Sequence, residues 1–523
     1  MYPGHHAQQF PERPAIIMAG SGETLSYGAL EQRSNRLAHL LRAQGLRRLD
    51  HYAVFMENNR PYIECCVAGE RSGLYYTCIN SYLKADELAY ILDNSESQVL
   101  ITSPSRLPVA LEALAHCPGV RLCLVVGDHP DLPLRQAGAA TIAAYESAIA
   151  AFPAGRIGDE CLGAAMLYSS GTTGRPKGIL RPLPEQPPEQ PLPLFAFLQT
   201  LWHGRAGMVY LSPAPLYHSA PLSNINITLR NGGTAVVMEH FDAEQYLALV
   251  QQYRVTHSQL VPTMFNRMLK LPPEVRARHD LSSLEIAVHA AAPCPVPVKE
   301  QMIAWWGPII HEYYGATEGM GITACDTAEW QAHRGTVGRV LLGDLHILDA
   351  DGRPVPPGTP GEVWFKTANP FVYYKDPERT ALTRSADGTM TTVGDMGYVD
   401  ADGYLYLTDR SSFMIISGGV NIYPQECENL LVTHPQVADA AVFGVPNEDL
   451  GEEVKAVVQL VEGVSAGPEL AQTLIAFCQQ HLARHKCPRS VDFIEQMPRL
   501  PTGKLYKRGL RDTYWVGHGT RIS

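Results

Sequence analysis

A run rich in glycine, serine and threonine, YSSGTTGRPKG, occupies residues 168–178. Hydroxyl groups and unhindered backbone N–H groups can surround the oxygen atoms of a phosphate, and Gly171 and Gly174 permit the close backbone approach that this requires. Lys177 adds a mobile positive charge. The run is not a Walker A loop, because Gly178 follows the lysine where serine or threonine would be expected. The spacing predicts a phosphate-binding loop; the plainer alternative is a polar surface loop.

The composition is that of an ordinary globular protein. The chain has 523 residues, of which 45% are hydrophobic and 18% charged, and this length corresponds to about two to four domains. Lys and Arg total 42 against 53 Asp and Glu, which gives a formal net charge of −11. Such a chain offers no overall attraction to nucleic acid or to an anionic membrane. We therefore expect no nucleic-acid partner, while a local basic patch could still bind a phosphate-rich small molecule.

The cysteines and the N-terminus indicate a cytoplasmic protein. There are 11 cysteines, an odd number, with no C-x-x-C spacing, which argues against a disulfide framework and a structural zinc site. The N-terminus has no basic region followed by an apolar run, as a signal peptide would. No apolar stretch approaches the roughly 20 residues that span a bilayer. We expect a soluble cytoplasmic protein without an integral membrane segment.

The first half of the chain alternates helical and strand-like patterns. Residues 27–44 carry leucines at spacings that suit one helix face, and short apolar runs lie at 52–56, 99–102 and 120–126, with helical stretches between them. Strands separated by helices indicate βα units and a mostly parallel sheet. Residues 180–193 are dense in proline and are expected to form an extended surface loop.

The character of the sequence changes after Asp409 and Arg410. The pattern predicts a helix, two strands, a second helix and a final strand, at 424–434, 437–445, 454–461, 469–484 and 490–495. These elements would make a compact α+β module with its own core. We predict two domains, 1–410 and 411–523, with a hinge at 409–412.

Six short motifs accompany the glycine-rich run in a fixed order. They are PLYH at 215–218, YYGATE at 313–318, GD at 394–395, DR at 409–410, MIISGGVNIYP at 414–424 and PTGK at 501–504. Together with residues 168–178, their order and spacing resemble the adenylate-forming superfamily of acyl-CoA synthetases, firefly luciferase and peptide-synthetase adenylation domains. The resemblance covers nearly the entire chain, and the ordered set of motifs is highly specific.

The resemblance implies an α/β fold class. The large N-terminal domain would have mixed sheets and helices, as in luciferase and acyl-CoA synthetases, and a small, mobile α+β domain would follow. ATP, Mg²⁺ and CoA are the implied cofactors and co-substrates. The implied nucleotide- and CoA-binding residues are Ser169, Ser170, Gly171, Thr172, Thr173, Gly174, Tyr314, Gly315, Thr317, Asp395, Arg410, Gly418 and Gly419.

The side chains assigned to the nucleotide suit their roles chemically. Tyr314 offers a flat apolar face for adenine, and Asp395 can accept hydrogen bonds from two neighbouring ribose hydroxyls. Glu318, the assigned metal ligand, offers a hard carboxylate oxygen suited to Mg²⁺. Arg410 would reach the ribose or phosphates, and Thr317 the α-phosphate or the acyl-adenylate. Taken singly, these residues would be a core tyrosine, a turn-capping aspartate and surface polar groups.

The resemblance assigns Lys504, Lys177 and His218 to catalysis. The ammonium of Lys504, in a loop flanked by proline and glycine, can bridge the substrate carboxylate and the α-phosphate as negative charge accumulates. His218 is an aromatic gate near the acyl pocket rather than a base. The resemblance further implies a second half-reaction, with a thiol, for which the small domain rotates, Lys504 leaves, and the loop at Gly418 and Gly419 forms the pantetheine tunnel. Taken alone, Lys504 would be an exposed lysine and His218 a core histidine.

Small side chains surround the expected acyl pocket. The implied substrate-binding residues are His218, Ser219, Ala220, Ala291 and Gly315. Amino-acid-activating domains usually carry an aspartate in the gate region, and residues 217–219 contain none. The pattern predicts a bulky apolar carboxylic acid that is fatty, aryl or polycyclic.

The predicted function is an ATP-dependent acyl-CoA synthetase that forms acyl-AMP with release of pyrophosphate and then acylates CoA. One alternative is an enzyme that loads a carrier protein or forms only acyl-AMP. Another is an inactive nucleotide sensor, but the joint presence of Lys177, Glu318, Asp395 and Lys504 argues against it. Ser412 and Phe413 are uncharged where the family usually has a charged and an acidic residue, which weakens any prediction of polar contacts in the hinge. The oligomeric state, including a homodimer, stays open.

Overall fold

The computed structural model describes residues 2–127, 135–169, 175–368, 370–410, 413–418, 420–499 and 505–516. The chain forms two compact units. Unit 1 consists of Met1–Leu260, Leu271–Ala287 and Phe371–Thr380, and unit 2 of Val261–Lys270, Val288–Pro370 and Ala381–Ser523. This division follows compactness and does not coincide with the expected hinge at 409–412, so the boundary between residues 410 and 411 stays a prediction.

Unit 1 contains the mostly parallel sheet that the sequence predicted. Its strands are β3 (His51–Phe55), β4 (Tyr75–Cys78), β5 (Ser97–Thr102), β6 (Leu122–Val125), β7 (Arg135–Ala137), β8 (Ala140–Ala144), β9 (Ala164–Ser169) and β10 (Lys177–Ile179). They lie in the order β10-β9-β4-β3-β5-β6-β8-β7. All neighbouring pairs are parallel except those formed by the two edge strands, β7 and β10. The apolar runs read from the sequence therefore correspond to β3, β5 and β6.

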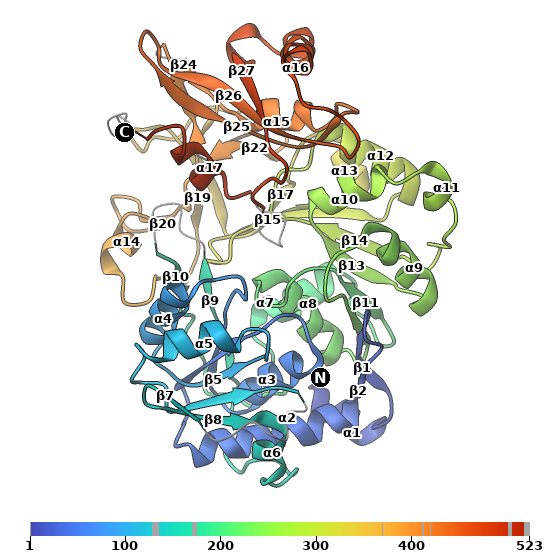
Figure 1. Ribbon diagram of the computed structural model, residues 1–523, viewed down its shortest axis with the longest axis vertical. Helices are drawn as coiled ribbons and strands as arrows, with labels where there is room; N and C mark the ends of the chain where they lie inside the picture. Colours follow the sequence, from blue (N-terminus) through green and yellow to red (C-terminus); the bar gives the residue numbers. More distant parts are fainter. Residues whose placement is uncertain are drawn as a thin grey trace. The chain divides into compact units, whose positions relative to one another are not determined.

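Helices cover both faces of this sheet (Figure 1). They are α2 (Tyr27–Ala43), α3 (Arg60–Arg71) and α6 (Tyr145–Ala150) on one face, and α4 (Ala85–Asn94) and α5 (Leu107–Leu114) on the other. Along β3, Val54 lies in the core cluster of α2 and α3, whereas Ala53 and Phe55 lie in that of α4 and α5. A strand covered on both faces is apolar at every position, which explains the uninterrupted apolar run at 52–56.

Helix α2 illustrates how local sequence sets an element of unit 1. The hydroxyl of Ser26 accepts a hydrogen bond from Ala29 N at 3.2 Å and caps the first turn. Leu30, Leu37 and Leu41 recur on one side and are fully buried, as an amphipathic helix requires. The helix predicted at 27–44 is confirmed.

A second sheet of unit 1 carries the chain that leads to the gate motif. In order it contains β13 (His257–Leu260), β11 (Val209–Ser212), β12 (Thr234–Val237), β1 (Pro14–Met18) and β2 (Thr24–Ser26), of which only β2 runs antiparallel to its neighbour. The helices of this part are α1 (Pro3–Gln9), α7 (Pro193–Leu201), α8 (Ser219–Arg230), α9 (Ala243–Tyr253) and α11 (Pro273–Arg276). Leu222 and Leu229 of α8 share a core cluster with Val237 of β12 and Val54 of β3.

The proline-dense segment of unit 1 contains neither helix nor strand over 180–192, all of which the structure describes. Its backbone carbonyls accept hydrogen bonds from side chains of the unit. Tyr75 Oη donates to Arg181 O at 2.6 Å, and Arg230 Nη1 to Pro188 O at 3.0 Å. The extended surface loop predicted from the prolines is confirmed, and these contacts hold it against the unit.

Unit 2 contains two antiparallel arrangements of strands upstream of the hinge. The first comprises β15 (Ile310–Gly315), β16 (Ile322–Cys325) and β17 (Arg339–Leu342), with helices α10 (Pro262–Leu269), α12 (Val296–Trp306) and α13 (Thr327–Ala332). The second comprises β18 (Asp344–Leu348), β19 (Gly361–Lys366), β20 (Met390–Thr391), β21 (Asp395–Val399) and β22 (Leu405–Arg410). β14 (Ile286–His289) and α14 (Pro377–Ala381) contribute residues to both units.

The α+β module predicted after the hinge is present within unit 2. Its sheet contains β24 (Val420–Ile422), β23 (Ile415–Ser417), β26 (Gly451–Leu460), β25 (Val437–Asn447) and β27 (Ser490–Phe493). Helices α15 (Gln425–Leu431), α16 (Pro468–His481) and α17 (Lys507–Asp512) and a short 3₁₀ turn at Arg484–Lys486 complete it. Leu431 of α15 and Leu474 of α16 are fully buried against Val442 and Ala456. The helices and strands predicted for this region are confirmed.

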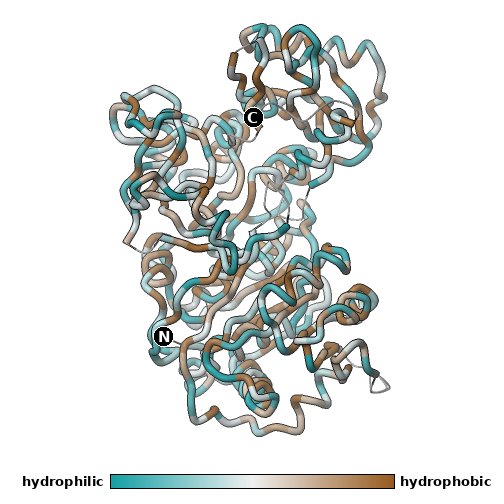
Figure 2. Tube along the Cα trace, turned by 90° about the vertical axis from the view of Figure 1, so that its left-hand side faces the viewer, coloured by the Kyte–Doolittle hydropathy of each residue, from teal (hydrophilic) through white to brown (hydrophobic). Residues whose placement is uncertain are grey.

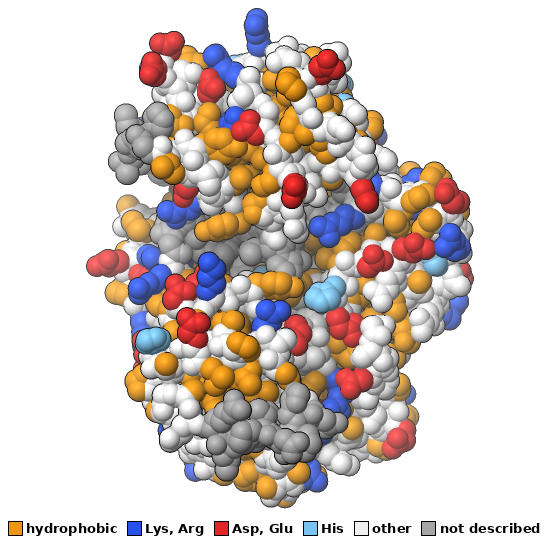
Figure 3. All heavy atoms as spheres, in the orientation of Figure 1, with side chains coloured by type: hydrophobic (Ala, Val, Ile, Leu, Met, Phe, Trp, Pro, Cys, Tyr) orange, Lys and Arg blue, Asp and Glu red, His pale blue; other side chains and the backbone are white. Residues whose placement is uncertain are grey.

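The described residues show no long apolar helix, and the face drawn in Figure 3 carries charged side chains of both signs. Among the described residues, no helix is both long and apolar enough to cross a membrane, and the hydropathy of the trace changes over short stretches (Figure 2). On the described part of the face in Figure 3, lysine and arginine side chains are interspersed with carboxylates.

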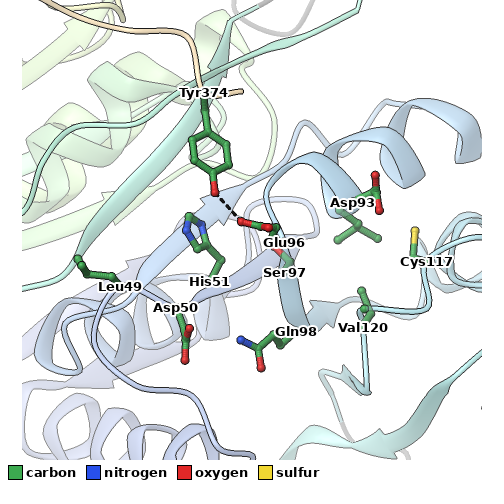
Figure 4. A pocket seen from close by; sticks show the side chains of 12 residues that line it. Leu49, Asp50, His51, Asp93, Glu96, Ser97, Gln98, Cys117, Val120 and Tyr374 are labelled. Atoms are coloured by element: carbon green, nitrogen blue, oxygen red, sulfur yellow. Dashed lines mark hydrogen bonds between the residues drawn. The ribbon is translucent and has the colours of Figure 1, made fainter. Parts of the chain in front are cut away.

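A polar pocket of about 480 Å³ lies in unit 1, where β3 and β5 begin. Its lining includes His51, Asp50, Glu96, Gln98 and Tyr374 (Figure 4). Tyr374 Oη donates a hydrogen bond to Glu96 at 2.5 Å. The ring of His51 stacks on Tyr374, and on Tyr75 at 4.9 Å between centroids. Burial lowers the pKa of His51 to about 4, although Glu96 and Asp50 act in the opposite direction.

We expect His51 to make the protein sensitive to acid. Unfolded histidine binds a proton below about pH 6.5, whereas native His51 stays neutral down to about pH 4. The unfolded state therefore binds more protons in this window, and stability falls as the pH falls. His51→Phe keeps a stacking ring and should flatten the dependence of the unfolding temperature on pH between 6.5 and 4. The exposed His116→Phe variant is the matched control; equal slopes in His51→Phe and wild type would contradict the assignment.

Candidate functional site

The ends of the predicted phosphate loop lie together in unit 1. β9 and β10 pair antiparallel, so Ser169 stands directly opposite Lys177, and Tyr168 opposite Gly178. A β-carbon at Gly178 would lie 2.8 Å from the end of the Met166 side chain and 3.0 Å from the Tyr168 ring, so a larger residue would require these side chains to shift. Residues 170–174, which include Ser170, Gly171, Thr172, Thr173 and Gly174, lie outside the described residues. The described part is a hairpin whose two strands hold the ends of this segment side by side.

An aromatic residue that sequence analysis missed lies against Lys177. The Nζ atom of Lys177 is 4.7 Å from the ring centroid of Tyr373, which is 5% exposed. Tyr373 forms a β-bridge with Ile179, and Tyr374 N donates to Gly178 O at 2.8 Å. A ring face attracts an ammonium group by about 0.5–2 kcal/mol. The segment FVYYKDPE at 371–378 thus belongs to the loop's surroundings; its tandem tyrosines were the only available signal in the sequence.

The gate segment of unit 1 is fixed by Asn58. The Asn58 amide donates to Ala214 O at 3.2 Å and to Met238 O at 2.8 Å, and its carbonyl accepts from Leu216 N at 2.9 Å. His218 occupies the N-cap position of α8, and its ring lies 4.3 Å from that of Tyr217. No sequence pattern points to Asn58, because its partners are more than 150 residues away.

Ser219 and Ala220, assigned to substrate binding, form the first turn of α8 directly after His218. Both side chains are half-buried. Their position in the first turn follows from the short connection between the end of β11 and the start of α8. His218, Ser219 and Ala220 are thus consecutive residues at the start of α8, and their assigned roles stay predictions.

In unit 2 the structure brings together two residues that are 81 positions apart. Tyr314, on β15, donates its hydroxyl hydrogen bond to Asp395 Oδ2 at 2.7 Å. Asp395 is the first residue of β21 and is 8% exposed. Arg410 is its backbone partner on β22, although the arginine side chain lies outside the description. The predicted adenine- and ribose-binding residues are therefore neighbours, and Tyr314 orients the Asp395 carboxylate.

A short polar chain supports the turn before Asp395. Gly394 adopts a positive φ of 82° and donates its N–H to Thr392 Oγ1 at 3.0 Å. Thr392 in turn donates to Glu362 Oε1 at 3.1 Å. Burial raises the pKa of Glu362, and the nearby Asp395 acts in the same direction. Glycine adopts this φ without strain. In the GD pair, Gly394 therefore provides the backbone conformation of the turn, and Asp395 provides the carboxylate.

Gly315, Thr317 and Glu318 occupy the end of β15 and the turn that leads to β16. Gly319 N closes the turn on Ala316 O at 2.9 Å, with a φ of 76° at Gly319. Glu318 is 9% exposed. A carboxylate held in a turn at this depth is the kind of hard oxygen donor that Mg²⁺ prefers, so the residues present fit a metal bound together with phosphate.

The loop that follows β14 contains a strained residue. Ala291, assigned to the acyl pocket, has a φ of 72°. A buried ion pair joins α12 to β15, in which Lys299 Nζ lies 2.6 Å from Glu312 Oε2. His289, fully buried, is also near this carboxylate, at 3.3 Å. Burial, together with Lys299, holds the pKa of His289 well below its usual range, so the ring is neutral.

Around the hinge and beyond it, the structure describes some of the assigned residues and not others. Asp409 Oδ2 accepts from Gln425 N at 3.0 Å and so joins the end of β22 to the start of α15. Gly418 has a φ of 56° and donates to Leu450 O at 2.8 Å. Gly419 and Lys504 lie outside the described residues. Their assigned roles stay predictions.

Comparison with known proteins decides the family. The model of the AMP-binding enzyme family matches residues 4–374, and that of the AMP-binding enzyme C-terminal domain matches 426–504. The chain belongs to the AMP-binding enzyme family. It is an AMP-forming acid–thiol ligase, and the α/β fold class expected from the sequence is confirmed.

Relatives of this AMP-binding enzyme align over nearly its whole length. It is 32% identical to the fatty acid–[acyl-carrier-protein] ligase ScoC of Streptomyces coeruleorubidus, covering 99% of this chain and 96% of the relative. It is 32% identical to a feruloyl-CoA synthase of Amycolatopsis sp, covering 98% of both. Identity to the long-chain-fatty-acid–CoA ligase FadD13 of Mycobacterium tuberculosis is 31%, covering 96% of both.

Solved structures agree. ATP-bound MatB from Rhodopseudomonas palustris superposes with a TM-score of 0.78 at 28% identity, covering 98% of this chain and 99% of that one. The o-succinylbenzoate CoA synthetase MenE from Bacillus subtilis, in complex with its acyl-adenylate intermediate, gives a TM-score of 0.79 at 25% identity, covering 99% and 98%. This AMP-binding enzyme therefore activates acyl groups by adenylation and binds ATP.

We expect Ala291→Gly to stabilise the enzyme. A left-handed backbone costs an alanine about 1–2 kcal/mol, a cost that glycine largely avoids, while glycine loses somewhat more conformational entropy on folding. The free energy of unfolding should rise by about 0.5–1 kcal/mol, measured by chemical denaturation. Ala292→Gly, one residue later and without a positive φ, is the matched control and should not stabilise. A loss of stability in Ala291→Gly equal to that in the control would contradict the strain assignment.

Proposed function

We propose that this enzyme converts a bulky apolar carboxylic acid to an acyl-adenylate, with release of pyrophosphate, and then transfers the acyl group to CoA. The observation that carries the proposal is the Tyr314–Asp395 contact, with Arg410 in register beside it. An aromatic face and a buried carboxylate, with an arginine on the neighbouring strand, supply the groups that an adenosine site needs. Full-length similarity to acyl-CoA and acyl-carrier-protein ligases supports the same reaction.

The first half-reaction joins two anions. The substrate carboxylate attacks the α-phosphorus of ATP, the bond to the β-phosphate breaks, and pyrophosphate leaves. Such a reaction needs positioning and positive charge rather than a protein nucleophile. We assign that charge to Lys177 and Lys504, with residues 169–174 around the phosphates and Thr317 at the α-phosphate. Glu318 would hold Mg²⁺, which when bound neutralises phosphate charge.

The second half-reaction replaces the AMP leaving group by a thiol. The thiolate attacks the carbonyl carbon, the bond between that carbon and the adenylate oxygen breaks, and AMP leaves. We propose that the domain 411–523 rotates about residues 409–412 between the two steps, so that Lys504 gives way to the Gly418–Gly419 loop. The positive φ at Gly418 supports a loop that lets a thin pantetheine chain pass beside the backbone.

The substrate assignment rests on side-chain size. Ser219 and Ala220 begin α8, and Ala291 lies in the loop after β14. None of these residues offers a charge to an amino group. Relatives named for fatty acids and for ferulate support an apolar acid. Pyrophosphate exchange with amino acids or acetate alone would overturn this part of the proposal.

A carrier protein is the second candidate acceptor, because the relative ScoC is named as a fatty acid–[acyl-carrier-protein] ligase. The two acceptors differ beyond the pantetheine arm that they share. AMP release that free CoA stimulates would support CoA as the acceptor. AMP release that only a phosphopantetheinylated carrier protein stimulates would support the carrier protein.

Tyr314→Phe should weaken recognition of the ribose. The variant keeps the aromatic face but removes the donor that orients Asp395, and hydrogen bonds to charged groups contribute about 1.5–3 kcal/mol. We expect KM for ATP to rise about tenfold or more, and the preference for ATP over 2′-deoxy-ATP to shrink. Tyr398→Phe, on the same strand as Asp395 but stacked on Tyr406, is the control. An unchanged preference for ATP over 2′-deoxy-ATP in Tyr314→Phe would contradict the assignment of Asp395 to the ribose.

Lys504→Ala should separate the two half-reactions. The rate of adenylation, measured by ATP–pyrophosphate exchange, should fall by about 100-fold or more. The reason is that the variant loses the positive charge that stabilises the transition state. Thioester formation from a supplied acyl-adenylate should stay within about threefold of wild type. Arg508→Ala, an exposed cation four residues later, should leave both rates unchanged. Wild-type exchange in Lys504→Ala would show that the catalytic assignment is wrong.

A further inference from the structure

The two ends of segment 500–504 are paired with each other in the small module of unit 2. Arg499 and Leu505 form an antiparallel β-bridge, and Tyr506 N donates to Pro498 O at 2.8 Å. The described residues on either side of Lys504 therefore run side by side. The chain leaves and re-enters the module at one place, so whatever holds residues 499 and 505–507 also holds the base of the lysine segment.

The first of these ends is anchored to β25. The guanidinium of Arg499 meets the carboxylate of Asp439 in a two-point contact, with Nη2 donating to Oδ1 at 2.7 Å and Nε to Oδ2. The two side chains are mostly buried, and Asp439 also accepts from Ala440 N at 2.8 Å. Bidentate arginine–carboxylate pairs fix direction as well as distance. Arg499 is therefore held in one orientation on the sheet.

The second end is anchored to α15. Lys507 Nζ lies 2.7 Å from Glu428 Oε1, and the two side chains are only 6% and 8% exposed. The same carboxylate oxygen accepts from Val442 N at 2.6 Å. The ammonium also lies 5.1 Å from the ring centroid of Phe413, the residue directly after the hinge. Lys507 thus ties the lysine segment to the helix, to β25 and to the hinge at once.

Phe413 is a position at which this chain departs from its family. The family's common acidic residue at position 413 is replaced by phenylalanine, and its ring faces a cation that is already paired with a buried glutamate. A ring face attracts an ammonium without adding a second buried negative charge beside Glu428.

We propose that Arg499 and Lys507 are positioning residues that clamp the base of the Lys504 segment for adenylation. The proposal rests on the proposed role of Lys504. Two ion pairs on different elements, β25 and α15, constrain both ends of a five-residue segment. They act together with the backbone pairing of 498–499 with 505–506. Because a misplacement of about 1 Å can cost about 100-fold in rate, the clamp should affect the step that uses Lys504 and not the step that does not.

The experiment compares the two half-reactions in variants of the full-length enzyme. Lys507→Met removes one partner, and the pair Lys507→Met with Glu428→Gln removes both charges, so no unpaired carboxylate stays buried. Lys507→Arg restores the cation, and Arg508→Ala removes an exposed cation from the same helix as a control. We measure ATP–pyrophosphate exchange, thioester formation from supplied acyl-adenylate, and the unfolding temperature.

We expect kcat for exchange to fall about 10- to 100-fold in Lys507→Met and in the double variant, with KM for ATP within about threefold. Thioester formation should stay within about threefold, and Lys507→Arg should recover most of the exchange rate. An equal loss in both half-reactions would show a purely structural role and overturn the proposal, as would wild-type exchange in the double variant. Full exchange in Lys504→Ala is a different outcome, because it would reject the assigned lysine itself.

Discussion

The repulsion between two anions, a carboxylate and the triphosphate of ATP, is the constraint on which the proposed site depends. The chain carries a net charge of −11, so its long-range field does not help these reactants to meet. Positive charge must be supplied locally and held in place. Lys177 begins an edge strand, and its ammonium lies against a buried tyrosine ring. Arg499 and Lys507 are fixed to secondary-structure elements on either side of segment 500–504. Charge on rigid supports needs little reorganisation when the reaction occurs.

Two buried carboxylates of unit 2, Asp395 and Glu428, have different partners, and the partner determines the role for which each carboxylate is suited. Asp395 meets a neutral phenol hydroxyl, which orients the group without neutralising it. Glu428 meets an ammonium at 2.7 Å and a backbone N–H, so its charge is compensated inside the module. The first arrangement suits ligand binding, and the second suits a structural joint.

Much of the fold follows from patterns that are local in sequence. The apolar runs became β3, β5 and β6, and the elements predicted after the hinge became α15, β25, β26, α16 and β27. Leucine spacing and capping are sufficient signals for such elements. The ends of the phosphate hairpin and the juxtaposition of Tyr314 with Asp395 agree with the roles inferred from the motifs. The hydrogen bond between those two residues could not be read from motifs that lie 81 positions apart.

Other residues around the site could not be predicted from any pattern in the sequence. Asn58, Tyr373 and Lys507 act through contacts with residues that are distant in the chain, and each is an ordinary residue type in its local sequence. The left-handed conformation of Ala291 is also invisible, because alanine is not a residue that marks such a backbone. These features arise when the chain folds and brings unrelated segments together.

The central claim is that the carboxylate itself attacks the α-phosphorus of ATP. The most direct test uses an apolar acid labelled with ¹⁸O in its carboxylate, with ATP, Mg²⁺ and CoA, and mass spectrometry of the products. With both carboxylate oxygens labelled, the account predicts one labelled oxygen in AMP, one labelled oxygen kept in the carbonyl group of the acyl thioester, and unlabelled pyrophosphate. Formation of ADP, or of AMP without label while thioester accumulates, would contradict it.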